Sequence, residues 1–259
     1  MKKNTLENKK HLLAYSAFAK AVLLSTALLV SCGKKEYHLV KVAGSITEID
    51  STLKSVPKIE EYIAPFKKSL DVQMNEPLSY NPVSMNKNDT KYNTAIGNML
   101  AAIVRDQGAP IYKSRTGNQV DMVLLNHGGI RAGMPAGPVT MRSAYEIMPF
   151  DNEIVAVELN ETQMSALINY LIEKKRAHPF DGIKIHIPKN GLPQVTRSHK
   201  KTYHILTSDY LYTGGDNMSF FKDAPMFQID FKIRNAMIAY FKKVDTLRFE
   251  SDNRFDSAQ

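Results

Sequence analysis

The residues best suited to chemistry lie between positions 120 and 131, where a short apolar strand runs into two glycines and an arginine. Glycines at the end of a strand indicate a tight turn or the close approach of a ligand to the backbone, because a Cβ would obstruct either. Arg131 follows that turn, and its planar, permanently charged guanidinium suits a phosphate or a carboxylate. The alternative is a solvated arginine beside an ordinary turn. The stretch is not a P-loop, because Met134 and Pro135 stand where Lys and Ser/Thr would be required.

Two later stretches carry residues that could complete a site. Phe150 and Asn152 come directly before an expected strand, and Tyr210 follows another strand shortly before Gly214-Gly215-Asp216. An aromatic ring on each side of a nucleobase contributes on the order of 1–3 kcal/mol per stacked base. A carboxylate only accepts hydrogen bonds, which suits the two hydroxyl groups of a ribose. The alternative for the aromatic residues is a place in the hydrophobic core.

The three stretches read, in order, Asn-x-Gly-Gly-Ile-Arg, Pro-Phe-x-Asn, and an aromatic residue with Gly-Gly-Asp shortly after it. This resembles the C-terminal, substrate-binding domain of the periplasmic and cell-surface 5′-nucleotidases, a group that includes UDP-sugar hydrolase and the 2′,3′-cyclic phosphodiesterases. The resemblance covers roughly residues 52–245. It implies that the chain is a stand-alone version of this domain.

The resemblance also implies roles for individual residues. Phe150 and Tyr210 would sandwich the base, and Asp216 would bind the ribose. Asn126 would meet the base edge or the ribose, and Arg131 would pair with a phosphate. The complete set of substrate-binding residues that we predict is Asn126, Gly128, Arg131, Phe150, Asn152, Tyr210, Gly215 and Asp216.

The sequence departs from the family pattern at three places. Asn217-Met218 follows Gly-Gly-Asp where the family often has glycine and an aromatic residue, and Asp151 stands where glycine is frequent. These changes could tilt the pocket or narrow the substrate range. Many members carry another arginine before the second helix, where this chain offers only Lys87 and Lys91, so we expect a weaker grip on phosphate.

We expect this chain to lack the catalytic half of such an enzyme. In the family, hydrolysis belongs to a separate N-terminal metallophosphatase domain, whose Asp, His and Asn ligands hold two metal ions. No Asp-x-His, Gly-Asn-His-Glu or His-x-His cluster occurs, and the seven histidines are scattered. We therefore expect no catalytic residue, no metal ligand and no cofactor in this chain, with divalent metals on a partner metallophosphatase.

Three functions remain open at this stage. The first is the nucleotide-binding module of a split 5′-nucleotidase that supports the breakdown of extracytoplasmic nucleotides with a separate metallophosphatase chain. The second is a non-catalytic nucleotide-binding lipoprotein that acts as a receptor or scavenger. The third is a structural module that keeps only the fold, which intact Phe150, Tyr210, Asp216 and Arg131 argue against. The sequence favours the first and identifies neither the base nor the number of phosphates.

The N-terminus resembles that of a bacterial lipoprotein. Residues 1–31 contain lysines followed by an apolar run from Ala21 to Val30, too short for a permanent membrane span, which predicts a signal peptide. The run ends at Ser31-Cys32, and Cys32 is the only cysteine of the chain. We predict lipidation at Cys32 and a location in the bacterial cell envelope, facing the periplasm or the cell surface.

Charge weakens the case for a nucleic-acid polymer as partner. Removal of residues 1–31 takes away five lysines and one glutamate, which is half of the formal net charge of +8. No run of Lys or Arg of the kind that follows a nucleic acid remains. We expect a nucleotide ligand, a metallophosphatase chain and, through the lipid, a membrane.

The elements that must position these residues alternate between helix and strand. Apolar residues at helical spacing, with caps at Thr140 and Asn160, predict helices over 56–70, 92–104, 140–148, 160–175 and 229–242. Strands are expected over 120–125, 153–159, 183–187 and 203–207, with a further strand and loops in 75–88. The pattern predicts an α/β (α+β) fold, a mixed β-sheet covered by helices in one domain over 56–245, with a tether over 32–55 and a tail over 246–259.

Overall fold

The computed structural model describes residues 15–16, 18–22 and 37–258. The chain divides into two units, Met1–Ser55 and Val56–Gln259. In the first unit, residues 37–50 form neither helix nor strand. The predicted lipidation site, Cys32, lies outside the described residues, and lipidation stays a prediction. None of the helices in the described ranges combines the length and the apolar character needed to cross a bilayer.

A mixed five-stranded sheet forms the centre of the second unit. Its strand order is β5-β2-β8-β4-β9. Strands β2 and β8 run parallel, and every other neighbouring pair is antiparallel. The strand bounds are β5 (Phe180–Asp181), β2 (Met122–Leu124), β8 (Thr202–Ser208), β4 (Glu153–Asn160) and β9 (Met226–Lys232). The predicted fold class is therefore confirmed.

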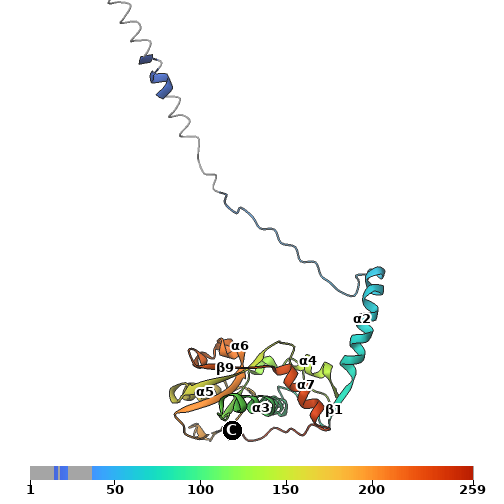
Figure 1. The fold of residues 1–259 in the computed structure, drawn as a ribbon, viewed down its shortest axis with the longest axis vertical. Helices are drawn as coiled ribbons and strands as arrows, with labels where there is room; N and C mark the ends of the chain where they lie inside the picture. Colours follow the sequence, from blue (N-terminus) through green and yellow to red (C-terminus); the bar gives the residue numbers. More distant parts are fainter. Residues whose placement is uncertain (1–14, 17, 23–36, 259) are drawn as a thin grey trace, which may run out of the picture. The chain divides into compact units, whose positions relative to one another are not determined.

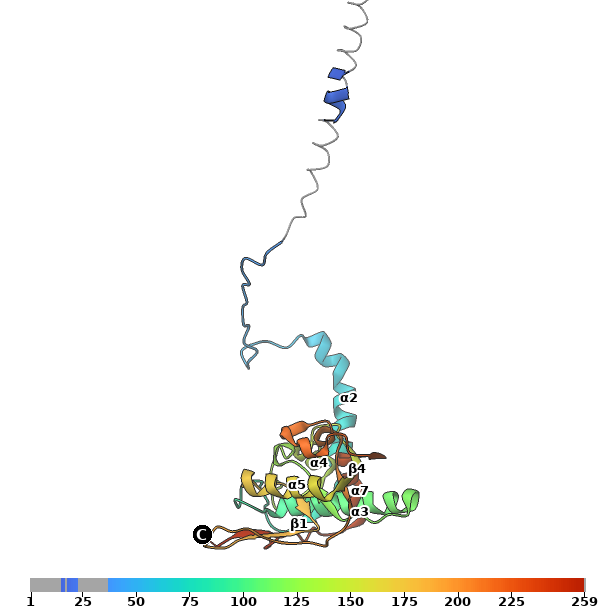
Figure 2. The same ribbon diagram turned by 90° about the vertical axis from the view of Figure 1, so that its left-hand side faces the viewer.

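The sheet is buried on both faces because its central strands are apolar on both faces. On β4, Ile154 and Ala156 pack among residues of α3 (Ala95–Thr116) and α7 (Ile233–Lys243). Val155 and Val157 point to the other face and pack against α5 (Glu161–Lys174). Burying each such Val or Ile side chain contributes roughly 1.5–3 kcal/mol. The helices thus cover opposite faces of the sheet, as Figures 1 and 2 allow the reader to follow.

Two smaller sheets border the central one. Strands β1 (Pro77–Asn81) and β3 (Gly137–Thr140) form an antiparallel pair. Strands β10 (Phe255–Ser257), β6 (Lys184–Ile187) and β7 (Gln194–Thr196) form the other, with β6 in the middle.

Two predicted helix starts are present as the sequence indicates. The Thr140 side chain caps α4 (Met141–Ile147), and Thr140 and Ser143 complete a capping box. Asn160 and Gln163 form the predicted capping box of α5. Each cap satisfies backbone N–H groups that a helix leaves free at its start, which fixes where the chain turns from strand to helix.

One predicted helix is too long at its start. Residues 229–232 belong to β9, and α7 begins at Ile233, whereas the sequence predicted helix from 229 onward. The apolar residues Phe227, Ile229 and Phe231 also fit the two-residue period of a strand. Pairing with β4 over residues 226–228 and again at Lys232, on either side of an irregularity, decides between the two periods, because it satisfies backbone groups on both sides of this segment.

Two further predictions need correction in the region after residue 187. The turn at Asn190-Gly191 leads from β6 into β7, an unpredicted strand that pairs with β6, and does not lead directly to β8. Residues 246–259 are not a tail outside the domain, because Phe255 is buried and β10 pairs with β6. In both cases short strands form because a partner strand is available.

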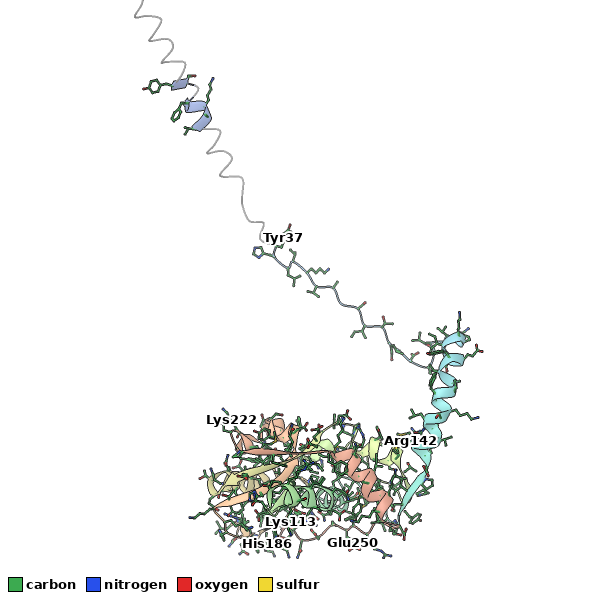
Figure 3. The ribbon with its side chains drawn as sticks, in the orientation of Figure 1. Tyr37, Lys113, Arg142, His186, Lys222 and Glu250 are labelled. Carbon is green, nitrogen blue, oxygen red and sulfur yellow. The ribbon has the colours of Figure 1, made fainter. Side chains whose placement is uncertain are left out.

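Helix α2 (Pro57–Asn75) begins at the predicted proline and extends beyond the predicted end at residue 70. None of its residues is buried, including the apolar stripe that predicted it. Arg142, labelled in Figure 3, anchors the end of this helix through an ion pair with Asp71. The apolar spacing thus predicted the helix correctly, although its apolar face is solvent-exposed here.

Candidate functional site

A cavity of about 330 Å³ lies where three strands of the central sheet meet their loops. Because β2 and β8 are parallel, the loops after both strands leave the sheet at the same edge. Because β4 is antiparallel to β8, the loop before β4 arrives at that edge too. Ligands of open α/β sheets commonly bind at such an edge. We call this the aromatic cavity; it is lined by Asn126, Gly128, Gly129, Arg131, Phe150, Asn152, Tyr210 and Asp216.

The loop after β2 forms the floor of the aromatic cavity. It makes a single 3-10 turn, η1 (His127–Gly129), and the Asn126 side chain before it is buried. A Cβ at Gly129 would lie 2.9 Å from Asn126 Oδ1, closer than real Cβ contacts come. The second glycine of the motif is thus needed to accommodate the Asn126 side chain.

Arg131 stands at the edge of this floor. Its backbone N–H donates to Ile147 O at 2.9 Å, and its guanidinium lies 5.8 Å from the centre of the Phe150 ring. Within the described ranges no carboxylate forms an ion pair with Arg131. Its charge therefore remains available to an anion in the cavity.

The two aromatic residues of the cavity are half exposed, unlike the large rings of the hydrophobic core. The exposed fractions are 43% for Phe150 and 42% for Tyr210, whereas Tyr112, Tyr203 and Phe180 are at most 2% exposed. The alternative that these two residues belong to the hydrophobic core is thus wrong, because both rings line a cavity. An exposed ring face loses apolar hydration when a base stacks on it.

Arg234 holds the loop that presents Phe150. This arginine is 8% exposed, and its Nη1 donates to the backbone oxygens of Pro149 at 2.9 Å and Phe150 at 3.2 Å. It also pairs with Asp151, which a second cation, Lys232, contacts at 3.1 Å. Asp151, the departure from the family's frequent glycine, therefore turns away from the cavity and fixes the loop.

Tyr210 and Asp216 are joined to each other. The Tyr210 hydroxyl donates to Asp216 Oδ1 at 2.9 Å, and this bond raises the pKa of Tyr210. A Cβ at Gly215 would come within 2.5 Å of the Tyr210 ring, so only glycine fits there. A phenylalanine at position 210 could not make this bond. Tyrosine thus adds a fixed donor to the carboxylate that the resemblance assigns to ribose.

The backbone at Asp216 is held in a conformation that non-glycine residues seldom adopt. Asp216 has φ 53° and Asn217 has φ 60°, both in the left-handed region. Such a residue costs on the order of 1 kcal/mol or more unless its surroundings fix it. Met218, another departure from the family pattern, is fully buried and anchors this turn in the core.

A second cavity of about 420 Å³ adjoins the first. We call it the basic cavity; it is lined by Gly128, Tyr170, Lys174, Arg176, His178 and Asp216. Burial lowers the pKa of His178 to about 4, so its ring is neutral at pH 7. Burial also lowers the pKa of His127, whose Nδ1 lies 3.1 Å from Ala177 O. His178 is thus a neutral part of the wall, whereas His127 does not line the cavity.

The two lysines of the stretch before α3 have different places. Lys87 Nζ donates to Ile130 O at 2.7 Å, next to Arg131. Lys91 lies 5.2 Å from the Tyr92 ring. Lys87 therefore puts a second cation beside the floor of the aromatic cavity.

Of the eight predicted substrate-binding residues, seven line the aromatic cavity, and Gly215 lies directly behind Tyr210. Their role in binding stays a prediction. Sequence reasoning missed Arg234 and the basic cavity, because neither belongs to a recognisable motif. In the described part of the chain no group of three or more His, Cys, Asp or Glu could hold a metal ion.

The comparisons with known proteins point to one family. Residues 73–188 match the family model described as 5′-nucleotidase, C-terminal domain. Among curated proteins, a trifunctional nucleotide phosphoesterase of Bacillus subtilis is 23% identical over 205 residues, which are 70% of this chain and 14% of that protein. An apyrase of Tabanus yao is 20% identical over 245 residues, 84% of this chain and 44% of that protein.

Solved structures show the same fold. A 5′-nucleotidase precursor from Thermus thermophilus superposes with a TM-score of 0.62 at 18% identity, over 76% of this chain and 42% of that one. A putative 5′-nucleotidase from Staphylococcus aureus gives 0.60 at 16% identity, over 81% and 45%. This chain spans less than half the length of each of these four proteins.

Proposed function

We propose, from the premise that residues 73–188 carry a 5′-nucleotidase C-terminal domain, that this chain binds nucleotides for a split 5′-nucleotidase. In this proposal the aromatic cavity selects and orients the nucleotide, and a metallophosphatase on another chain hydrolyses it. The observation that carries the proposal is the composition of the aromatic cavity. Two half-exposed rings, a fixed carboxylate and an arginine that forms no ion pair with any described residue line it.

Each part of a nucleotide has a matching group. The base stacks between Phe150 and Tyr210, whose loops are fixed by Arg234 and by the tight turn at Gly215. Asp216 has one oxygen bonded to Tyr210, which leaves the other for the ribose hydroxyl groups. Arg131 receives a phosphate as a charge-assisted partner. Prearranged groups of this kind lower the entropic cost of ordering the site on binding.

In this division of roles, this chain binds and orients the nucleotide, and the partner chain carries out the hydrolysis of its phosphate group. Phosphate-monoester hydrolysis is accelerated up to about 10²¹-fold by enzymes, and two-metal sites achieve such rates by activating water and neutralising developing charge. Holding a substrate in a productive orientation contributes a separate part, roughly 7–11 kcal/mol in favourable cases.

We also propose that the protein is located at the cell envelope. A signal peptide over residues 1–31 and lipidation at Cys32 would retain the domain at the envelope, where extracytoplasmic nucleotides are met. The test is metabolic labelling with a fatty-acid analogue, in which Cys32→Ser abolishes the label. Unchanged labelling and membrane retention would remove this part of the proposal.

Calorimetry of the full chain in detergent tests nucleotide binding. We expect saturable binding of AMP, weaker binding of ribose 5-phosphate, and a loss of at least about tenfold in AMP affinity for Asp216→Asn. Asp223→Asn is the matched control, because Asp223 is exposed, has φ 60° and does not line the aromatic cavity. Asparagine tolerates this backbone conformation at both positions.

Turnover separates the split enzyme from the alternative, a receptor or scavenger. A cognate metallophosphatase chain should bind this protein and release phosphate from AMP faster in its presence, and Arg131→Gln should lower that gain. If AMP binds but no metallophosphatase associates, the receptor reading replaces the split enzyme. If AMP does not bind, both readings fail.

A further inference from the structure

We propose that the basic cavity holds a second phosphate of the bound nucleotide, attached on the 2′,3′ side of its ribose. The ligand class is a nucleoside with phosphate groups on both sides of the ribose, such as a nucleoside 3′,5′-bisphosphate or a dinucleotide with a 5′-phosphate. This inference rests on the proposed binding of nucleotides in the aromatic cavity, and it specifies which class of nucleotide binds there.

The two cavities share part of their lining. Gly128 and Asp216 line both of them, so one ligand can reach from one cavity into the other. At the junction Gly128 contributes no side chain that would divide the space. Each cavity alone, about 330 Å³ and about 420 Å³, lies near the lower end of the roughly 300–1,000 Å³ of small-molecule sites. The joined space therefore suits a ligand longer than a nucleoside monophosphate.

Arginines without ion pairs gather at this joined space. The chain has nine arginines, and all of them lie in the described part of the structure. Six of these arginines contact a carboxylate, namely Arg105, Arg115, Arg142, Arg197, Arg234 and Arg254. Of the other three, Arg131 lines the aromatic cavity and Arg176 lines the basic cavity. Uncompensated cations on both sides of a cavity favour a ligand with two anionic groups.

The basic cavity has an excess of positive charge. Lys174 and Arg176 stand against a single carboxylate, Asp216, which already accepts a hydrogen bond from Tyr210. No ion pair involves Lys174 or Arg176 in the described ranges. Lys174 Nζ lies 5.4 Å from the centre of the Tyr170 ring, which keeps the ammonium group beside the opening without neutralising it.

The wall behind these cations is fixed. The Tyr170 hydroxyl donates to the backbone oxygen of Asp216 at 3.0 Å, and its ring meets His178 edge to face at 5.7 Å. His178 is 3% exposed, and its Nδ1 accepts from the backbone N–H of His127 at 3.3 Å. Contacts within the protein therefore hold the wall of the basic cavity in place.

The order of groups along the joined space matches the proposed ligand. Arg131 lines only the aromatic cavity, Asp216 lines both cavities, and Lys174 and Arg176 line only the basic cavity. In a nucleoside 3′,5′-bisphosphate a free ribose hydroxyl stands between two phosphates, and it can donate to Asp216. The repulsion between Asp216 and the second phosphate is offset by the two cations.

Competition between ligands measures the second phosphate directly. With the full chain in detergent, we expect adenosine 3′,5′-bisphosphate to bind roughly tenfold more tightly than AMP at low salt, because two exposed cations each contribute modestly. High salt should reduce this ratio, since exposed charges are screened. A 5′-phosphorylated diadenylate tests whether the second phosphate can be a diester. An equal gain in affinity over AMP would mean that the basic cavity accepts phosphodiesters as well, and no gain would restrict it to phosphomonoesters.

The double variant Lys174→Gln/Arg176→Gln should bring the ratio of the two affinities close to one. Lys175→Gln is the matched control: it removes the same kind of charge from the residue between them, which does not line the basic cavity. Equal melting temperatures verify that all variants fold. An unchanged ratio in the double variant, or a bisphosphate that binds wild type no more tightly than AMP, would overturn this inference alone. Failure of AMP itself to bind would overturn the proposed function together with it.

Discussion

Two cavities of this domain are both lined by arginines and differ in what those arginines contact. The larger, about 600 Å³, lies beside β5 and β6 and includes Asp181, Arg197, Asp252 and Arg254; we call it the paired cavity. There Arg254 contacts Asp252 at 2.7 Å, and Arg197 pairs with Glu161. In the smaller aromatic cavity Arg131 has no such partner among the described residues. As a candidate ligand site, the paired cavity would be favoured by size alone, whereas the unpaired charge of Arg131 favours the aromatic cavity.

The same pairing of a guanidinium with an aromatic ring occurs in both cavities. Arg197 lies 5.2 Å from the Tyr203 ring, and Arg131 lies 5.8 Å from the Phe150 ring. Tyr203 is 2% exposed and its hydroxyl donates to Glu161 at 2.6 Å, whereas Phe150 is 43% exposed. A charge that already has its counter-ion gains little from a ligand, and one that lacks it gains more. The paired arginines thus hold the fold together, and Arg131 remains available for binding.

We expect the largest effect from a substitution that removes a carboxylate of the paired cavity. Asp181 accepts from Arg105 Nε at 2.6 Å and from the backbone N–H of Val123 at 2.8 Å, which ties α3 to the sheet. Asp181→Ala leaves both donors without a partner, so we expect the free energy of unfolding to fall by about 2–3 kcal/mol. Urea denaturation measures this loss.

AMP affinity should remain within about twofold in this variant, because Asp181 does not line the aromatic cavity. The control is Asp230→Asn, which removes an exposed pair with Arg115 and should cost less than about 1 kcal/mol. A nucleotide affinity that fell as far as the stability would contradict the separation of the two regions.

Acid should weaken the two regions at different pH. The pKa of His178 is lowered to about 4 by burial, below its unfolded value near 6.5. The unfolded chain then binds more protons, so the contribution of neutral His178 to stability is full above pH 6.5 and is lost as the pH falls toward 4. This loss can reach about 3 kcal/mol. The pKa of Glu161 is lowered to about 2 by its bonds to Arg197 and Tyr203, so its contribution is lost only below pH 4.5.

Hydrogen exchange at pH 5 measures the difference. Amides around residues 125–130 should lose protection before those around residues 202–205. The variant His178→Gln should reduce the pH dependence between pH 6.5 and 4, and the part that remains is assigned to His127, whose pKa burial also lowers. Simultaneous loss of protection in both segments would show that His178 does not set the acid sensitivity.

Aromatic substitutions should affect binding in one cavity and stability in the other. Phe150→Ala should weaken AMP binding by about 1–3 kcal/mol, because one stacking surface is lost. Its effect on the melting temperature should be small, since the ring is half exposed in the free protein. Tyr203→Phe is the counterpart, and it should leave AMP affinity unchanged while lowering stability by about 1 kcal/mol. Calorimetry and thermal melting together check both; a destabilised Phe150→Ala with normal affinity would return that ring to a structural role.

The smallest expected effect concerns the unpaired arginine itself. Arg131→Gln should weaken binding of AMP by about 1 kcal/mol at low salt and leave binding of adenosine unchanged, because only the phosphate contact is lost. The loss should shrink at high salt. Lys87→Gln serves as a comparison for the neighbouring cation that donates to Ile130 O. Equal losses for AMP and adenosine would mean that Arg131 supports the loop and not the phosphate.

Much of the fold could be predicted because its determinants are local. The capping boxes at Thr140 and Asn160 fixed two helix starts, since a cap needs only residues three positions apart. The errors arose where partners are distant in sequence. Residues 229–232 became strand through pairing with β4, and β7 and β10 formed because β6 offers its two edges.

The sequence by itself determined which side chains this protein can present: two rings, two glycines, a carboxylate and an arginine in three ordered stretches, enough to indicate a 5′-nucleotidase C-terminal domain. Only the tertiary structure decided that these stretches share one edge, because that depends on β2 and β8 being parallel and β4 antiparallel to β8. It also decided which arginines are free. The partners of Arg105 and Arg197 lie 76 and 36 residues away in sequence, so their pairing, and by contrast the open charge of Arg131 and Arg176, exists only once the chain has folded.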